Sequence, residues 1–208
     1  MQNIIEKLEQ MFIVPLVVIN DVSKAVPLAK ALCNGGLPCA EIAFRTSEAA
    51  EAINAITSTM PEMLVGAGTI LSPAQVDEAL SVGAKFIVSP GLNPDVVRYC
   101  QSKGVPVFPG VCTPTEIEQG LALGLNMLKF FPAEAAGGIN MLKAVAGPYR
   151  NVRFMPSGGI TQKNLPDYRA VKSVFACSGS WMVKDELIAA GDFDKITELT
   201  KEAVSLLK

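Results

Sequence analysis

The segment LVGAGTILSPAQVDEALSVGAKFIVSP, residues 64–90, holds one complete repeat of a pattern that recurs along the chain. A short β-rich run at 64–70 is followed by Ser72 and Pro73, a cap residue and a first-turn proline, and then by an amphipathic stretch. Gly83 stands where a helix should stop, and a second β-rich run ends the segment. This order of signals predicts a strand, a helix and a second strand parallel to the first.

The same alternation continues from one end of the chain to the other. Thr113 and Pro114 repeat the cap and proline signal, and Gly124 repeats the helix stop. We expect eight strands, near residues 13–19, 39–45, 64–70, 86–90, 105–109, 127–131, 152–156 and 174–178. The expected helices lie at about 2–11, 22–34, 47–59, 73–82, 94–103, 114–123, 140–146, 164–171 and 193–207.

Eight strands that alternate with helices indicate a parallel sheet, and right-handed crossovers then favour closure. The predicted fold class is therefore α/β, a closed (β/α)₈ TIM barrel with an extra N-terminal helix. We expect residues 1–208 to form a single barrel domain, because no linker or low-complexity segment divides the chain. A doubly wound open sheet is the structural alternative.

Composition narrows the classes of protein to consider. The chain has 208 residues, of which 50% are hydrophobic and 18% charged, and its net charge is −2. This balance, without any Lys/Arg run, predicts no nucleic-acid partner. The longest apolar run, at 11–19, is far shorter than the ~20 residues of a membrane helix, so no membrane partner is expected. Five cysteines without a C-x-x-C pair favour reduced thiols in the cytoplasm.

The sequence contains no histidine. Zinc sites commonly use histidine or clustered cysteines, so we expect no metal and no cofactor. The usual proton carrier at neutral pH is also missing. Acid and base chemistry must then be done by a carboxylate, a lysine, a tyrosine or water.

Alternation along the strands predicts which side chains share a face. In CAEIAFR, Ile42 and Phe44 suit packing under the helices, which leaves Glu41 and Arg45 on the interior face. In NMLKFFP, the same rule points Lys129 inward. We expect these charged side chains to converge inside the barrel. A buried ion-pair network that only holds the strand register is the structural alternative.

Two further residues belong to this predicted interior. Phe131 follows Lys129 on the inward face, and Thr69 follows Val65 and Ala67 along LVGAGTI. An amine is a nucleophile only when unprotonated, and both the Phe131 wall and Arg45 favour the neutral form, whereas a nearby carboxylate opposes it. A neutral lysine amine facing a carbonyl substrate forms a Schiff base, whose iminium accepts electrons from a breaking carbon–carbon bond.

The remaining inward groups suit the other needs of such a reaction. Glu41 is the inward carboxylate that could transfer protons. Arg45 presents a planar fork that matches a substrate carboxylate, and Thr69 adds a hydroxyl. Glycine–serine loops follow the last two strands, at 156–160 and 178–182. In barrels these loops commonly bind phosphate, so we expect the substrate to carry a phosphate.

These residues together resemble the class I 2-keto-3-deoxy-6-phosphogluconate (KDPG)/4-hydroxy-2-oxoglutarate (KHG) aldolase family. The matching segments are EIAFRT (41–46), VGAGTI (65–70), VSPGLNP (88–94), LKFFPAEAAGG (128–138), AGPY (146–149), RFMPSGGI (153–160) and SGSWMV (178–183). They cover nearly the whole chain in order. The resemblance implies a (β/α)₈ barrel that assembles as a homotrimer in the bacterial cytoplasm.

The resemblance also implies a role for each site residue. Lys129 would be the Schiff-base lysine and Glu41 the general acid and base. The implied binding residues are Arg45 and Thr69 for the substrate carboxylate, Pro90 and Phe131 for the pocket wall, and Ser157, Gly158, Gly159 and Ser180 for the phosphate. The chain departs from the family pattern at Ser157, where threonine is more usual, and at Ser178, where glycine is expected. We expect the first change to keep the hydroxyl and the second to reshape the phosphate loop slightly.

The implied reaction is the reversible cleavage of KDPG to pyruvate and glyceraldehyde 3-phosphate. The same site could prefer KHG, which gives pyruvate and glyoxylate, or the phosphogalactonate epimer of KDPG. Two other classes stay open on the residues alone. One is a phosphosugar isomerase or epimerase that uses Lys129 only as an electrostatic clamp, and the other is a non-catalytic barrel that binds a phosphorylated acid.

Overall fold

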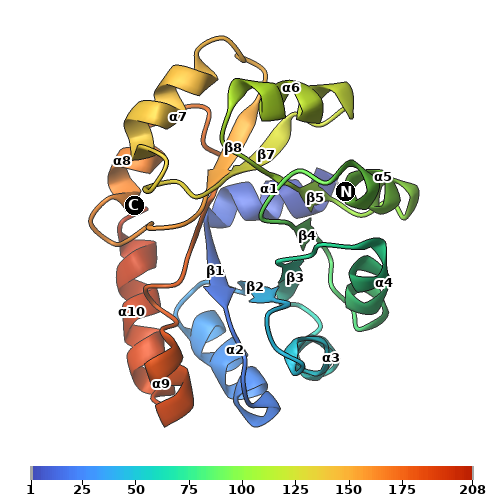
Figure 1. Ribbon diagram of the computed structural model, residues 1–208. Helices are drawn as coiled ribbons and strands as arrows, with labels where there is room; N and C mark the ends of the chain where they lie inside the picture. Colours follow the sequence, from blue (N-terminus) through green and yellow to red (C-terminus); the bar gives the residue numbers. More distant parts are fainter. Residues whose placement is uncertain (1, 208) are drawn as a thin grey trace.

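The computed structural model describes residues 2–207, with the strands in the middle and most helices around them (Figure 1). The strands are β1 (Ile13–Val17), β2 (Cys39–Ala43), β3 (Leu64–Gly68), β4 (Ile87–Val88), β5 (Val107–Phe108), β6 (Gly110–Val111), β7 (Met127–Phe130), β8 (Arg153–Pro156) and β9 (Cys177–Gly179). The helices are α1 (Gln2–Met11), η1 (Val22–Lys24), α2 (Ala25–Asn34), α3 (Ala49–Thr59), α4 (Pro73–Ser81), α5 (Pro94–Ser102), α6 (Pro114–Ala122), α7 (Gly138–Ala146), α8 (Leu165–Arg169), α9 (Asp185–Ala190) and α10 (Phe193–Ser205).

Every strand pair in the two sheets is parallel, which confirms the predicted α/β class. One sheet has the order β5-β4-β3-β2-β1-β9, and the other has the order β6-β7-β8. Two isolated parallel bridges, Phe154 to Val174 and Ser157 to Ser178, connect β8 to the segment that contains β9. Parallel strands of one sheet end at the same edge, and the bridges from β8 join the two sheets, so the residues that follow β2, β3, β7, β8 and β9 lie on the same side of the strands.

The predicted fifth strand, residues 105–109, is wrong in extent. It is replaced by β5 and β6, which are separated by Pro109. The carbonyl of Phe108 accepts a hydrogen bond from Ser89 beside β4, whereas the carbonyl of Pro109 accepts one from Lys129 of β7. Proline has no N–H to continue a ladder, and the chain changes partner strand at this residue.

The helix signals in the sequence are confirmed by local contacts. Ser72 accepts a hydrogen bond from the backbone of Gln75, and Thr113 forms a capping box with Glu116. Gly124 ends α6 with φ of +77°, a conformation that glycine adopts without strain. The short helix α9 was not predicted, because its six residues begin without a side-chain cap.

Helix α1 lies at the amino ends of the strands, opposite the edge where the strands end. Glu9 of α1 forms an ion pair with Arg153, the first residue of β8. The guanidinium carbon of Arg153 lies 5.7 Å from the centre of the Phe175 ring, which extends this contact into the core. Within residues 2–207, no helix is long and apolar enough to span a membrane.

Candidate active site

Glu41 lies in the middle of β2, between Leu16 of β1 and Gly66 of β3. Its side chain is fully buried. The space that it occupies depends on Gly68 of β3, because a Cβ atom there would lie 2.3 Å from Oε1 of Glu41. A charged side chain can therefore enter this otherwise apolar interior because the neighbouring strand carries no side chain at that position.

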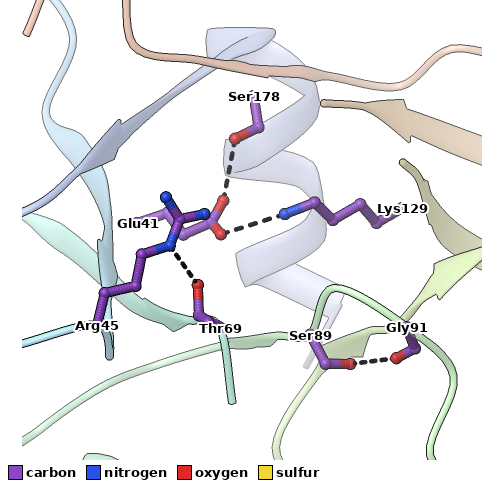
Figure 2. A network of polar contacts seen from close by, with 7 residues as sticks. All are labelled: Glu41, Arg45, Thr69, Ser89, Gly91, Lys129 and Ser178. Atoms are coloured by element: carbon purple, nitrogen blue, oxygen red, sulfur yellow. Dashed lines mark hydrogen bonds and ion pairs between the residues drawn. The ribbon is translucent and has the colours of Figure 1, made fainter. Parts of the chain in front are cut away.

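Lys129 reaches the same interior from the other sheet. It lies on β7 between Gly110 of β6 and Met155 of β8, and 4% of the residue is exposed. Its Nζ atom is 3.5 Å from Oε1 of Glu41 and 5.2 Å from the ring centre of Phe131. Figure 2 shows the two side chains extending toward each other. The convergence predicted from strand alternation is confirmed for Lys129 and Glu41.

The geometry of this pair differs from that of a tight structural ion pair. Charge-assisted N–H···O bonds are commonly about 2.7–2.9 Å long, so the Lys129–Glu41 contact at 3.5 Å is loose. An ammonium group has three donor protons, and within residues 2–207 Glu41 is the one hydrogen-bond partner of Nζ. These surroundings, with few hydrogen-bond partners and an aromatic ring nearby, are suitable for an amine that reacts with an incoming carbonyl.

Ser178 makes a contact that the sequence did not predict. Its fully buried hydroxyl donates a 3.0 Å hydrogen bond to Oε2 of Glu41 (Figure 2). The two carboxylate oxygens of Glu41 are therefore distinct, since Oε1 faces Lys129 and Oε2 faces Ser178. The signal in the sequence was a polar residue inside the apolar run of the last strand.

Arg45 and Thr69 are brought together, but not in the way that alternation predicted. Strand β2 ends at Ala43, and Arg45 is exposed beyond it instead of sharing the buried face of Glu41. Thr69 follows β3 with φ of +60°, a left-handed conformation that is unusual for a β-branched residue and breaks the alternation. The Nε atom of Arg45 donates to the Thr69 hydroxyl at 3.3 Å.

This contact leaves most of the guanidinium available. Among residues 2–207, the two terminal amino groups of Arg45 have no hydrogen-bond or ion-pair partner. They form the planar fork that matches a carboxylate. The pair of Arg45 and Thr69 thus presents anion-binding donors at the edge where the strands end, and Figure 2 shows the contact between them.

Pro90 and Phe131 lie at the ends of β4 and β7, and both are half-buried. The loop after β4 lies directly against Gly110, where a Cβ atom would be 2.0 Å from the carbonyl oxygen of Pro90. Phe131 also contacts the first glycine loop, since a Cβ at Gly158 would lie 3.3 Å from its ring. Phe131 therefore connects the surroundings of Lys129 to the loop after β8.

The two glycine–serine loops lie side by side. Ser157 follows β8 and is bridged to Ser178 of β9, while Ser180 follows β9 and is exposed. The Ser157 hydroxyl is buried and, within the described chain, has no hydrogen-bond partner. Gly158 and Gly159 have φ of +94° and +84°. A buried free hydroxyl beside left-handed glycines can bind an anion.

The cysteines near the strand ends are not arranged as nucleophiles. Burial raises the pKa of the Cys177 thiol, and burial followed by the charge of Glu116 raises the pKa of Cys112. Both groups are therefore thiols at neutral pH, as expected for packing residues. Within residues 2–207, no three His, Cys, Asp or Glu side chains form a group that could hold a metal ion.

Parallel strands that deliver a buried lysine and a carboxylate to one interior supply the groups that a Schiff-base lyase requires. A model of the family "KDPG and KHG aldolase" matches residues 4–199. The 2-dehydro-3-deoxy-phosphogluconate aldolase of Treponema pallidum is 48% identical, over 100% of this chain and 99% of the relative. This chain belongs to the KDPG and KHG aldolase family.

Two solved structures of the family have the same fold. The aldolase of Zymomonas mobilis ZM4, solved with 3-phosphoglycerate, has a TM-score of 0.93 and 40% identity, covering 99% of this chain and 97% of that one. The KDPG aldolase of Legionella pneumophila, solved with pyruvate captured at low pH as a covalent carbinolamine intermediate, has a TM-score of 0.92 and 38% identity. That match covers 95% of this chain and 96% of the other.

Proposed function

We propose that this protein is a class I aldolase that reversibly cleaves KDPG to pyruvate and glyceraldehyde 3-phosphate, and that it also cleaves KHG to pyruvate and glyoxylate. The observation that carries the proposal is the buried Lys129 amine 3.5 Å from the buried Glu41 carboxylate. The covalent pyruvate in the Legionella pneumophila relative supports the same chemistry here. Both substrates contain the pyruvyl half that this pair would process.

In the proposed mechanism, the neutral amine of Lys129 attacks the C2 ketone to form a carbinolamine. Glu41, acting through water, transfers protons while the carbinolamine loses water to become an iminium. Glu41 then removes the C4 hydroxyl proton, the C3–C4 bond breaks, and its electron pair moves to the iminium. The aldehyde leaves, and the resulting enamine is protonated at C3 and hydrolysed, which releases pyruvate and restores the amine.

The remaining site residues would hold the two ends of the substrate. Arg45 and Thr69 present donors for the pyruvyl carboxylate, and Pro90 and Phe131 form the wall of the pocket. We assign the phosphate of KDPG to the loops after β8 and β9. Its ligands would be Ser157, Gly158, Gly159 and Ser180, and the buried free hydroxyl of Ser157 supports this assignment.

We further propose that the two parallel sheets close into one (β/α)₈ barrel domain, with α1 as the extra N-terminal helix. The bridges between β8 and the β9 segment and the change of partner at Pro109 support closure on both sides. The five free cysteines support a cytoplasmic location. A homotrimer is proposed on the resemblance to the family, and its measurement is the mass of the protein in solution.

Borohydride trapping tests the proposed chemistry. The wild-type protein is incubated with pyruvate and sodium borohydride, beside Lys129→Ala and, as a matched control, Lys103→Ala. We expect one reduced pyruvate on the wild type and on Lys103→Ala, located at Lys129 by peptide mapping, and none on Lys129→Ala. An isomerase, an epimerase or a non-catalytic barrel would give no adduct, so an unmodified wild type at saturating pyruvate contradicts the aldolase proposal.

A comparison of the two substrates tests the phosphate site. Only KDPG carries a phosphate, so Ser157→Ala should raise KM for KDPG by roughly 10–100-fold, the effect of losing one hydrogen bond to a charged group. KM for KHG should change by less than about twofold, because KHG does not reach that loop. Equal changes for both substrates would contradict the assignment of Ser157 to phosphate.

A further inference from the structure

The buried contact between Ser178 and Glu41 has no role in the mechanism described above. The Ser178 hydroxyl donates to Oε2 at 3.0 Å, while Oε1 faces Lys129. We infer that Ser178 is a positioning residue, which holds one oxygen of the Glu41 carboxylate and so directs the other toward the reacting amine. The inference rests on the proposed function, since it assigns proton transfer to Glu41.

The backbone of Ser178 is held on both sides. It pairs with Val14 of β1 and forms an isolated bridge with Ser157 after β8. Across the carboxylate, Gly68 leaves the space for Oε1, since a Cβ there would be 2.3 Å away. Oε2 of Glu41 is thus bonded to a donor whose backbone pairs on both sides, and Oε1 occupies the space that a glycine on β3 leaves. Support of this kind is what a proton-transfer group requires.

The charges around Glu41 are few. Strands β1 (IVPLV) and β3 (LVGAG), which pair with β2, carry no titratable side chain. On β9, Cys177 lies on the opposite face from Ser178 by alternation. Among the residues drawn in Figure 2, the other charged side chains are those of Lys129 on β7 and Arg45 beyond β2.

Within residues 2–207, Lys129 and Ser178 are the side chains that hydrogen-bond to Glu41. Lys129 changes during the reaction, because its nitrogen becomes bonded to carbon. The hydrogen bond from Ser178 is the one that can persist through every step. A hydroxyl that donates to a carboxylate favours the ionised form, so its removal makes the carboxylate bind a proton more tightly. The base form of Glu41 would then require a higher pH.

The experiment compares wild type, Ser178→Ala, Ser178→Gly and Ser178→Thr. Two quantities are measured: the pH dependence of kcat and KM for KDPG, and the titration midpoint of the Glu41 carboxyl in the resting protein by carbon-13 NMR, assigned with Glu41→Gln. For Ser178→Ala and Ser178→Gly, we expect the midpoint and the acid limb of kcat to move about one pH unit higher. KM should change little, and Ser178→Thr, which keeps the hydroxyl, should restore the wild-type profile.

Ser89→Ala is the matched control. Ser89 is 2% exposed and its hydroxyl donates to the carbonyl of Gly91 at 3.0 Å, so the change removes a buried hydroxyl of the same region that does not contact Glu41 (Figure 2). Its acid limb and midpoint should match those of the wild type. An equal shift in Ser89→Ala would show a general effect of a lost hydroxyl and would overturn the inference.

Two other results would overturn the inference. One is an unchanged midpoint and acid limb in Ser178→Ala and Ser178→Gly. The other is a higher KM for KDPG with an unchanged acid limb, which would assign Ser178 to the phosphate end. Because the NMR titration requires no turnover, it decides the role of Ser178 even if the wild type fails to trap pyruvate, a result that would contradict only the proposed function.

Discussion

Two lysine–carboxylate pairs in this molecule differ in burial, and the distance between their charged atoms does not indicate which pair matters more. Lys103 lies 2.9 Å from Asp77, and the two side chains are 41% and 53% exposed. Lys129 lies 3.5 Å from Glu41, and these side chains are 5% and 0% exposed. Water can solvate each member of the surface pair separately, so its shorter contact has little consequence. In the longer, buried pair, water cannot replace either partner, so each charged group depends on the other.

The surroundings of the two lysines also differ. On the surface, the Tyr99 hydroxyl and then Lys103 hydrogen-bond to Asp77 and lower its pKa. Asp77 and then Tyr99 in turn raise the pKa of Lys103, which holds this amine in its charged, unreactive form. Lys129 contacts one carboxylate oxygen and an aromatic ring. A lysine that must lose its proton to react needs surroundings like those of Lys129, with few groups that hold the charged form.

The largest expected difference between the pairs lies in their carboxylates. Glu41→Gln should lower kcat by roughly 10²–10⁴-fold, because an amide cannot transfer the proton. Asp77→Asn, the same chemical change in the surface pair, should leave kcat unchanged. The measurement is steady-state cleavage of KDPG by both variants, with folding checked by circular dichroism. Equal activities for the two variants would remove the functional distinction between the pairs.

A smaller effect is expected from two glycines of β3. Gly68→Ala would place Cβ 2.3 Å from Oε1 of Glu41, and the displaced carboxylate should lower kcat/KM by roughly 10–100-fold. Gly66→Ala would place Cβ 2.3 Å from the Phe86 ring, which should destabilise the fold by about 1–3 kcal/mol without moving Glu41.

Kinetics and urea unfolding separate these two effects. Gly66→Ala should retain kcat/KM per folded molecule at a temperature where it is folded, whereas Gly68→Ala should not. If both variants lost activity only in proportion to their unfolding, then Gly68 would have a packing role, and the buried pair would not depend on the space that this glycine leaves.

The smallest effect is expected for Glu116, a carboxylate that caps helix α6 and contributes to stability. Burial raises the pKa of Glu116, but hydrogen bonds from Cys112 and Thr113 lower it by more, and its pKa lies below the ordinary value. This stabilisation is present above the unfolded pKa of about 4.3 and is lost as pH falls through the folded pKa. Glu116→Gln should therefore lower the free energy of unfolding by about 0.5–1 kcal/mol at neutral pH.

That difference should shrink as pH falls from the unfolded pKa through the lower folded pKa, because the wild-type carboxyl then becomes protonated. Urea unfolding of both proteins at neutral pH and at a series of lower pH values measures it. Glu78→Gln, an exposed position on α4, is the control and should leave the free energy of unfolding unchanged at each of these pH values. A constant difference between wild type and Glu116→Gln at all pH values would contradict the role of the charge.

Strand and helix alternation, helix caps and the inward direction of Lys129 and Glu41 were predictable from the sequence. Each depends on local patterns, such as Ser72 before Pro73 or a lysine between apolar neighbours in a strand. The break at Pro109 was not predictable in the same way, because strands of two residues are defined by the partners that they meet across the sheet.

Three features of the site were not predicted from the sequence, because they also depend on how distant segments meet in the fold. The exposure of Arg45 depends on where β2 ends, and the position of Thr69 depends on a left-handed residue that no alternation rule contains. The contact of Ser178 joins residues 137 positions apart in the sequence. Such contacts follow from the closure of the fold and not from any segment of it.

The position of α1 has a practical consequence. This helix lies against the amino ends of the strands, where Glu9 binds Arg153, while Arg45 and Thr69 lie at the opposite edge, beyond the ends of β2 and β3. A linker or solid support attached through α1 would therefore hold the protein by the side that substrates do not need to reach. Immobilisation at this helix should leave the edge that carries Arg45 and Thr69 open to diffusing substrate.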